Sequence, residues 1–168
     1  MERREYQEKD GSISVEAKGR IILIDSSLLM YVIKGKKKLP INLEDALLSV
    51  SEGGELAVLD TTIEELELLR DKRKGKTRIA ADFALEFIRR LNIRVIKADP
   101  RIIESVKKLG QKLRSYEVYD EILARMAEKI GAAVATTDME LVKKLRRRNI
   151  PCYFLSGRNW IKVSGFQY

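Results

Sequence analysis

The chain has 168 residues, of which 45% are hydrophobic and 35% charged, and this length and composition fit one globular domain with a sizeable core. It contains no histidine and one cysteine, which excludes an imidazole base, a Cys/His zinc site and a Ser-His-Asp or Cys-His catalytic arrangement. Any hydrolysis must therefore rest on carboxylates and a bound hard cation, while the net charge of +8 favours a polyanionic partner.

The first 19 residues are too polar for a signal peptide, and no apolar run reaches the roughly 18 residues that span a bilayer. The lone Cys152 allows no internal disulfide, so we expect a soluble cytoplasmic protein without a membrane partner. Residues 1–19 form a charged extension in which Ile13, Val15 and Ala17 alternate weakly, as in an edge strand. The domain itself is expected over 20–157, with 158–168 as a tail whose Trp160 and Phe166 cover the core.

Short apolar runs alternate with longer segments of helical period, which is typical of βαβ units and a parallel sheet. The predicted strands are 20–24, 55–59, 93–96, 132–135 and 152–155. Helices are predicted to begin near Ser26, Asn42, Thr62, Thr77, Pro100, Asp120 and Met139. The sequence therefore predicts an α/β fold, a three-layer α/β/α sandwich around a parallel five-stranded sheet of order 3-2-1-4-5.

Four acidic residues fall where predicted strands end or helices begin. Asp25 follows the first strand, Asp138 lies just past the fourth, Glu65 is on the first turn after the second, and Asp120 opens the helix before the fourth. In such sheets ligands bind at the carboxyl ends of strands where the strand order reverses, so Asp25 and Asp138 should converge there.

Capping offers an alternative for three of these acids. Glu65 completes a capping box with Thr62, Asp120 complements a helix dipole, and Asp138 suits an N-cap. Asp25 has Ser26 and Ser27 beside it as caps, so capping explains it less well.

Four acids at one edge repel one another unless a cation neutralises them, and Mg²⁺ or Mn²⁺ suits an all-oxygen site. Other phosphate-handling patterns fail: Ser27 stands where a haloacid-dehalogenase phosphatase needs aspartate, and Asp25 lacks the second acid of a receiver domain. Gly75-Lys76-Thr77 is not a P-loop, because Arg70 stands where the earlier glycine belongs. Metal-assisted phosphodiester cleavage remains the best chemical match.

Three basic runs, 34–38 (KGKKK), 70–78 (RDKRKGKTR) and 143–148 (KKLRRR), accompany the acids. Each alone fits a solvated surface, but together they indicate a nucleic-acid backbone as partner. The candidate nucleic-acid-binding residues are Lys36, Lys37, Lys38, Arg73, Lys74, Lys76, Arg146, Arg147 and Arg148.

The acids lie in four segments, 24–29 (IDSSLL), 60–66 (DTTIEEL), 120–124 (DEILA) and 135–138 (ATTD). In order and spacing these segments resemble the four acidic motifs of PIN-domain nucleases, and the resemblance covers about residues 20 to 155.

This resemblance implies that Asp25, Glu65, Asp120 and Asp138 are catalytic and hold one or two Mg²⁺ or Mn²⁺ ions. Glu65 is chosen over Glu64 because leucine follows the family's glutamate. Ser26 and Thr136 match supporting hydroxyl positions, whereas Ser27 replaces a frequent asparagine.

The resemblance further implies a divalent-metal-dependent endoribonuclease that acts in RNA processing or as the toxin of a toxin-antitoxin module. The segments after Glu65 and Asp138 are more similar to the archaeal and eukaryotic rRNA-processing type, with the VapC-type toxins as the neighbouring subgroup. The implied partners are RNA, an antitoxin or an RNA-processing assembly, and a second copy in a homodimer. A catalytically silent RNA-binding or assembly protein is the alternative, and a flap-type DNA nuclease is a third reading.

Overall fold

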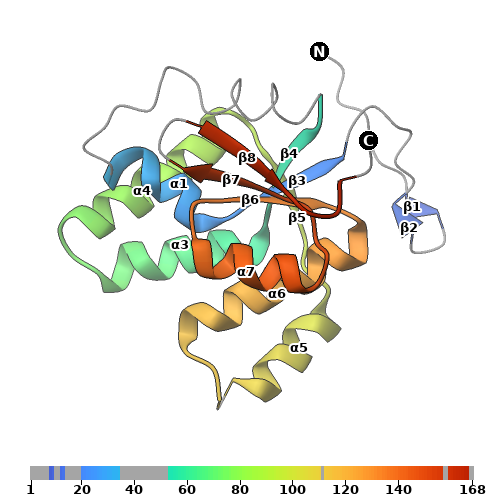
Figure 1. The fold of residues 1–168 in the computed structure, drawn as a ribbon. Coiled ribbons are helices and arrows are strands. Elements are labelled where there is room, and N and C mark those ends of the chain that lie inside the picture. Colours follow the sequence, from blue (N-terminus) through green and yellow to red (C-terminus); the bar gives the residue numbers. More distant parts are fainter. Residues whose placement is uncertain are drawn as a thin grey trace.

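The computed structural model describes residues 8–9, 12–13, 20–34, 53–110, 112–156 and 159–166. Within these ranges none of the helices is long and apolar enough to cross a membrane. The helix predicted near Asn42 and the candidate RNA-binding residues Lys36, Lys37 and Lys38 lie outside the described residues. The elements, shown in Figure 1, are β1 (Glu8–Lys9), β2 (Ser12–Ile13), β3 (Ile21–Ile24), α1 (Ser26–Lys34), β4 (Glu55–Leu59), α3 (Asp60–Lys72), α4 (Lys76–Arg90), β5 (Arg94–Ile96), α5 (Pro100–Leu109), α6 (Ser115–Ile130), β6 (Ala133–Thr136), α7 (Met139–Arg147), β7 (Cys152–Ser156) and β8 (Asn159–Val163).

The main sheet has six strands in the order β5-β4-β3-β6-β7-β8. Within this sheet β3, β4, β5, β6 and β7 pair in parallel. Numbered in chain order from β3, they confirm the predicted order 3-2-1-4-5. β8 adds a sixth strand that runs antiparallel to β7. β3 lies between β4 and β6, so the strand order reverses beside it, and Asp25 directly follows its last residue.

The two faces of β3 supply two separate cores, because successive side chains of a strand point to opposite faces. Leu23 packs in one cluster with Val106 of α5, Ile122 of α6 and Leu145 of α7. Ile22 and Ile24 pack in the other with residues of α1, α3 and α4. Helices therefore cover both faces of the sheet, which confirms the predicted three-layer arrangement.

Two helices begin earlier than the sequence predicts. α3 begins at Asp60, whose carboxylate accepts hydrogen bonds from the N–H of Thr61 (2.8 Å) and of Ala98 (2.9 Å) and so ties the helix to the segment after β5. α6 begins at Ser115, where the Glu117 carboxylate accepts from the N–H of Arg114 at 2.8 Å. The predicted start at Asp120 was wrong. The regular spacing of apolar residues that marks this helix is clear only after its first turn.

The ends of the chain add structure beyond the sheet that the sequence predicts. β8 lies within the segment expected to form a tail, and Trp160 and Phe166 pack against the α1/α4 core as expected. The Phe166 ring lies 4.8 Å from that of Tyr153, centroid to centroid. At the other end β2 pairs with β1 in a separate two-stranded sheet, so as far as residues 12–13 are described they do not extend the main sheet.

We expect the segment after β8 to be sensitive to a side chain at Gly165. Its φ is +77°, and a Cβ there would meet the Asn149 carbonyl oxygen at 2.8 Å and Pro151 at 3.0 Å. Gly165→Ala should therefore lower the free energy of unfolding, measured by urea denaturation, by about 1–3 kcal/mol more than Gly131→Ala. Gly131 is the matched control because its φ is +67° and nothing lies within 4 Å of the added Cβ. Equal losses would show that the segment moves aside without cost.

Candidate functional site

Asp25 is a buried carboxylate held by two hydroxyl groups. Its exposed fraction is 5%, and its N–H donates to the carbonyl of Ala135 on the neighbouring strand (2.9 Å). Its Oδ2 accepts hydrogen bonds from Ser27 Oγ at 2.5 Å and from Thr136 Oγ1 at 2.8 Å. Burial raises the pKa of Asp25, these hydrogen bonds oppose the rise, and the charge of Asp138 adds to it. Ser27 thus supports the first aspartate where the family often has asparagine.

The same hydroxyl groups join β3 and α1 to the turn that follows β6. Ser27 Oγ lies 3.2 Å from Thr136 Oγ1 and accepts a hydrogen bond from Thr137 Oγ1 at 3.1 Å. Thr136 Oγ1 also accepts from the N–H of Asp138 at 3.0 Å. This network fixes the backbone of Asp138 relative to the carboxylate of Asp25. Thr137 was missed from the sequence, although its hydroxyl directly follows Thr136 in the ATTD segment.

Glu65 lies in the second turn of α3, because that helix begins at Asp60. A capping box with Thr62 is therefore ruled out as the reason for this residue. The pKa of Glu65 is raised to about 7, chiefly by burial and also by the charge of Asp25, while a hydrogen bond with Ser26 opposes the rise. The side chain of Ser26 thus forms a hydrogen bond with Glu65. The neighbouring Glu64, the alternative to Glu65 in the sequence, is exposed.

Asp120 is the sixth residue of α6, so it does not complement the helix dipole at the first turn. Its pKa is raised to about 8, chiefly by burial and in addition by the charges of Asp25, Glu65 and Asp138, against a smaller opposing effect of Lys144. Asp120 therefore lies within electrostatic reach of all three other acids.

Asp138 is the N-cap of α7, as the capping alternative predicted. Its Oδ1 accepts a hydrogen bond from the N–H of Glu140 at 2.9 Å. Its charge still raises the pKa of both Asp25 and Asp120. Capping and membership of the acidic group are therefore compatible at this position.

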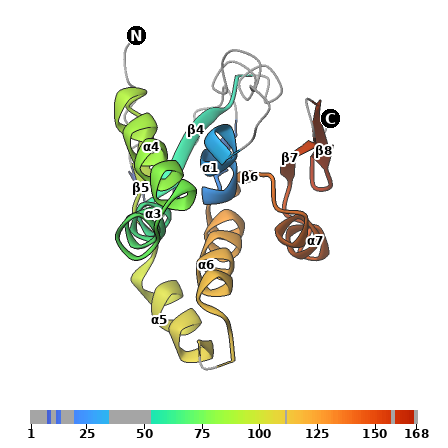
Figure 2. The same cartoon turned by 90° about the vertical axis from the view of Figure 1, so that its left-hand side faces the viewer.

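The four acids lie at the carboxyl edge of the sheet: Asp25 between β3 and α1, Glu65 in α3, Asp120 in α6 and Asp138 just before α7. In Figure 2 these elements surround the centre of the view, with α1 above α6, α3 on the left and α7 on the right. A donor set made only of carboxylate and hydroxyl oxygens suits Mg²⁺ or Mn²⁺, and the mutual repulsion of the acids would be relieved by a cation. In the described ranges, however, no group of three or more Asp, Glu or Cys side chains lies close enough together to hold a metal ion. The acids therefore match a hard cation in the type of their ligand atoms and in their position at one edge of the sheet.

The predicted basic residues that the structure describes differ in location and exposure. Arg73, Lys74 and Lys76 are exposed at the turn between α3 and α4, and Arg146 and Arg147 are exposed at the end of α7. Arg148, by contrast, is half-buried and donates to the carboxylate of Glu121.

A polar cleft of about 760 Å³ connects the basic residues of α7 with two of the acids. It runs between the start of α6 and α7, and of the three predicted arginines it reaches Arg147 and Arg148 but not Arg146. Lys144 belongs to the basic run 143–148 that the sequence indicates, although it is not among the single candidate residues. The cleft is lined by Leu113, Tyr116, Glu117, Asp120, Asp138, Glu140, Leu141, Lys144, Arg147 and Arg148.

The structure is thus of the class of three-layer α/β proteins with acidic residues at the carboxyl edge of the sheet, beside a cleft lined by acidic and basic side chains. The sequence profile of the PIN domain matches residues 22–146. The chain belongs to the PIN-domain family.

Two curated relatives cover most of the chain. Ribonuclease VapC9 of Archaeoglobus fulgidus is 29% identical over 142 residues, which are 82% of this chain and 84% of that one. Ribonuclease VapC4 of Methanocaldococcus jannaschii is 30% identical over 147 residues, 86% of this chain and 96% of that one. Among solved structures, VapBC2 from Rickettsia felis bound to a promoter DNA fragment shares the fold, with a TM-score of 0.54 and 16% identity over 81% of this chain and 99% of that one.

We expect the stability of the metal-free protein to fall as the pH rises. The folded-state pKa values of Glu65 and Asp120 are about 7 and about 8, whereas unfolded carboxyls titrate near pH 4. The folded chain then holds more protons than the unfolded one between these limits, so the free energy of unfolding decreases as the pH rises through them. Thermal unfolding in a chelator between about pH 5 and pH 8 measures this.

Asp120→Asn removes one of the charges that develop in this range, so its melting temperature should change less with pH than that of the wild type. Glu128→Gln, an exposed carboxylate on the same helix, should leave the wild-type slope unchanged. A wild-type melting temperature that is flat or rises over this range would contradict the proposed burial of the acids.

Proposed function

We propose that this PIN-domain protein is an endoribonuclease that depends on Mg²⁺ or Mn²⁺. The observation that carries the proposal is the convergence of Asp25, Glu65, Asp120 and Asp138 at the strand-order reversal, where burial and neighbouring acids raise the pKa of the first three. Such a set, in a chain without histidine, matches hydrolysis assisted by one or two hard cations.

RNA is the substrate that the relatives favour, because both curated relatives are named ribonucleases. Their VapC names also favour the toxin of a toxin-antitoxin module over an rRNA-processing enzyme, although segments after Glu65 and Asp138 look more like the processing type. An antitoxin protein is accordingly the proposed protein partner.

In this mechanism the residues of the chain hold and orient the reacting groups. All four carboxylates would bind the metal ions, and Ser27 and Thr136 hold the carboxylate of Asp25 in one orientation. Ser26 holds Glu65 in a similar way. The bound cations would supply activation of water and stabilisation of charge on the attacking and leaving oxygens. The exposed Arg73, Lys74, Lys76 and Arg147 would hold the RNA backbone without reading its sequence.

Asp25→Asn should abolish metal-dependent cleavage while the protein stays folded. The substitution keeps the shape but removes the charge of the most buried acid, so we expect cleavage of a labelled RNA to fall by about a hundredfold or more. Mn²⁺ should raise the melting temperature of the wild type and not that of Asp25→Asn, because a ligand stabilises only the state that binds it.

Asp82→Asn makes the same change at an exposed position of α4 and should retain both cleavage and the response to Mn²⁺. Full activity of Asp25→Asn would show that the four acids are not the catalytic site. A wild type that binds RNA in Mn²⁺ without forming products would instead support a catalytically silent RNA-binding protein.

Arg147→Gln should weaken RNA binding, because Arg147 is exposed and lines the cleft that holds Asp120 and Asp138. We expect the slope of log affinity against log salt to become shallower by roughly 0.7, the value for one lost contact to a single strand. Fluorescence anisotropy of a labelled RNA in a chelator measures both quantities. Arg89→Gln is the control, since this exposed arginine lies in the last turn of α4, ahead of the amino end of β5. An equal effect of both substitutions would show that only net charge matters.

A further inference from the structure

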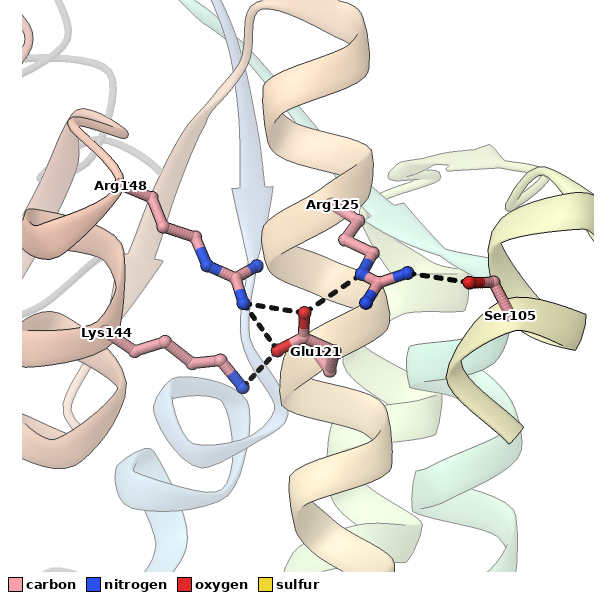
Figure 3. A network of polar contacts seen from close by, with 5 residues as sticks. All are labelled: Ser105, Glu121, Arg125, Lys144 and Arg148. Atoms are coloured by element: carbon pink, nitrogen blue, oxygen red, sulfur yellow. Dashed lines mark hydrogen bonds and ion pairs between the residues drawn. The ribbon is translucent and has the colours of Figure 1, made fainter. Parts of the chain in front are cut away.

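Glu121 is a buried carboxylate surrounded by three cations, and the sequence gives no role to it. Its exposed fraction is 5%, and it directly follows the proposed metal ligand Asp120 on α6. As Figure 3 shows, Arg125 approaches it from the same helix, and Lys144 and Arg148 reach it from the α7 side of the cleft. The nitrogen-to-oxygen distances are 2.9 Å for Arg125, 2.5 Å for Lys144, and 2.6 and 2.9 Å for Arg148.

The charges of this cluster do not balance. One carboxylate faces three cations, and Asp120 beside it also interacts with Lys144, so the positive charge of the cluster is partly compensated. The three cationic side chains are 26–31% exposed, so water can solvate their remaining charge. They can therefore accept a further anion while they stay bound to Glu121.

The cations are turned toward the cleft. The side chains of Lys144 and Arg148 are 26% and 31% exposed, whereas that of Glu121 is 7% exposed. Both are among the residues that line the cleft, together with Arg147, Asp120 and Asp138. Arg148 uses only Nη2 for both contacts with Glu121, which leaves at least three of the five N–H donors of its guanidinium unused by that carboxylate. The ammonium group of Lys144 has three N–H donors, so it too can contact a further acceptor beside Glu121.

We propose that Glu121 is a positioning residue that holds Lys144 and Arg148 in a preformed subsite for a phosphate of the RNA backbone, next to the acidic group. The inference rests on the proposed ribonuclease function and deepens it, because it assigns where the strand lies relative to the acids. The carboxylate fixes two long cationic side chains before RNA arrives, which reduces the rotamer entropy that binding would otherwise lose. The phosphate would compensate the remaining positive charge of these partly exposed cations.

Glu121→Gln separates positioning from simple charge. The substitution makes the protein more positive by one charge, so long-range electrostatics alone predicts tighter RNA binding. Loss of positioning predicts the opposite, an RNA affinity about five- to tenfold weaker. Glu128→Gln makes the same change of charge at an exposed position of α6 and should bind RNA at least as tightly as the wild type.

The experiment measures binding of a short single-stranded RNA by anisotropy in a chelator, with a series of copies in which one phosphate at a time is an uncharged methylphosphonate. The wild type and Glu128→Gln should lose affinity most strongly at one position of the series. Glu121→Gln should bind all copies more nearly alike, since the subsite that reads this phosphate is no longer formed. Lys144→Gln should show the same pattern, and the double variant should bind no more weakly than the weaker single variant.

Equal or tighter binding by Glu121→Gln, with the position effect retained, would overturn the proposal. If circular dichroism shows that Glu121→Gln does not fold, Lys144→Gln decides alone, and binding like that of the wild type would overturn the proposal. A wild type that binds no RNA would overturn the ribonuclease function itself, whereas normal wild-type binding with an unaffected Glu121→Gln would overturn only the role of Glu121.

Discussion

Repulsion among carboxylates at one edge of the sheet is the constraint on which the rest of the site depends. Burial and the neighbouring negative charges raise the pKa of Glu65 to about 7 and that of Asp120 to about 8, so full ionisation of this group is costly in the bare protein. A fold that keeps such a group must stabilise it by other means. The sheet supplies the position, because the carboxyl end of β3 is the point where the strand order reverses. Hydroxyl donors supply part of the stabilisation, and a cation would supply the remainder.

The hydroxyl groups explain why the site tolerates a serine two residues after the first aspartate. Ser27 and Thr136 both donate to one oxygen of Asp25, and Thr137 donates to Ser27 in turn. These bonds connect the ends of two adjacent strands, so the carboxylate is oriented by the sheet itself. These hydroxyls find partners within their own network, which helps to keep the polar cluster rigid.

The fold was largely predictable from the sequence because buried parallel strands read as short apolar runs between helical segments. β4 was predicted with its observed bounds, and the reversal of strand order beside β3 followed from known topology rules. The start of α6 was not predictable, because its first turn contains Tyr116 and Glu117 and shows no apolar period. The partner of Arg148 was not predictable either, since an ion pair between residues 27 positions apart depends on how two helices pack. Local patterns therefore identified which residues carry charge, whereas tertiary structure decided which of those charges are available to a ligand.

The helix α7 separates the two kinds of charge that a metal-dependent nuclease needs. Asp138 caps its N-terminus, where a negative charge interacts favourably with the helix dipole, and Lys144, Arg147 and Arg148 lie at its C-terminal end, where positive charge does. The nine residues of the helix set this separation at roughly 13 Å, and the contact with Glu121 holds its basic end against α6. A proposed metal ligand and the proposed phosphate contacts are thus mounted on one rigid element. Asp120 and Glu121 lie on α6, however, so a movement of α7 relative to α6 would change the spacing of the acids and weaken the cationic subsite together. The alignment between the acidic group and the cationic subsite therefore depends on how these two helices pack.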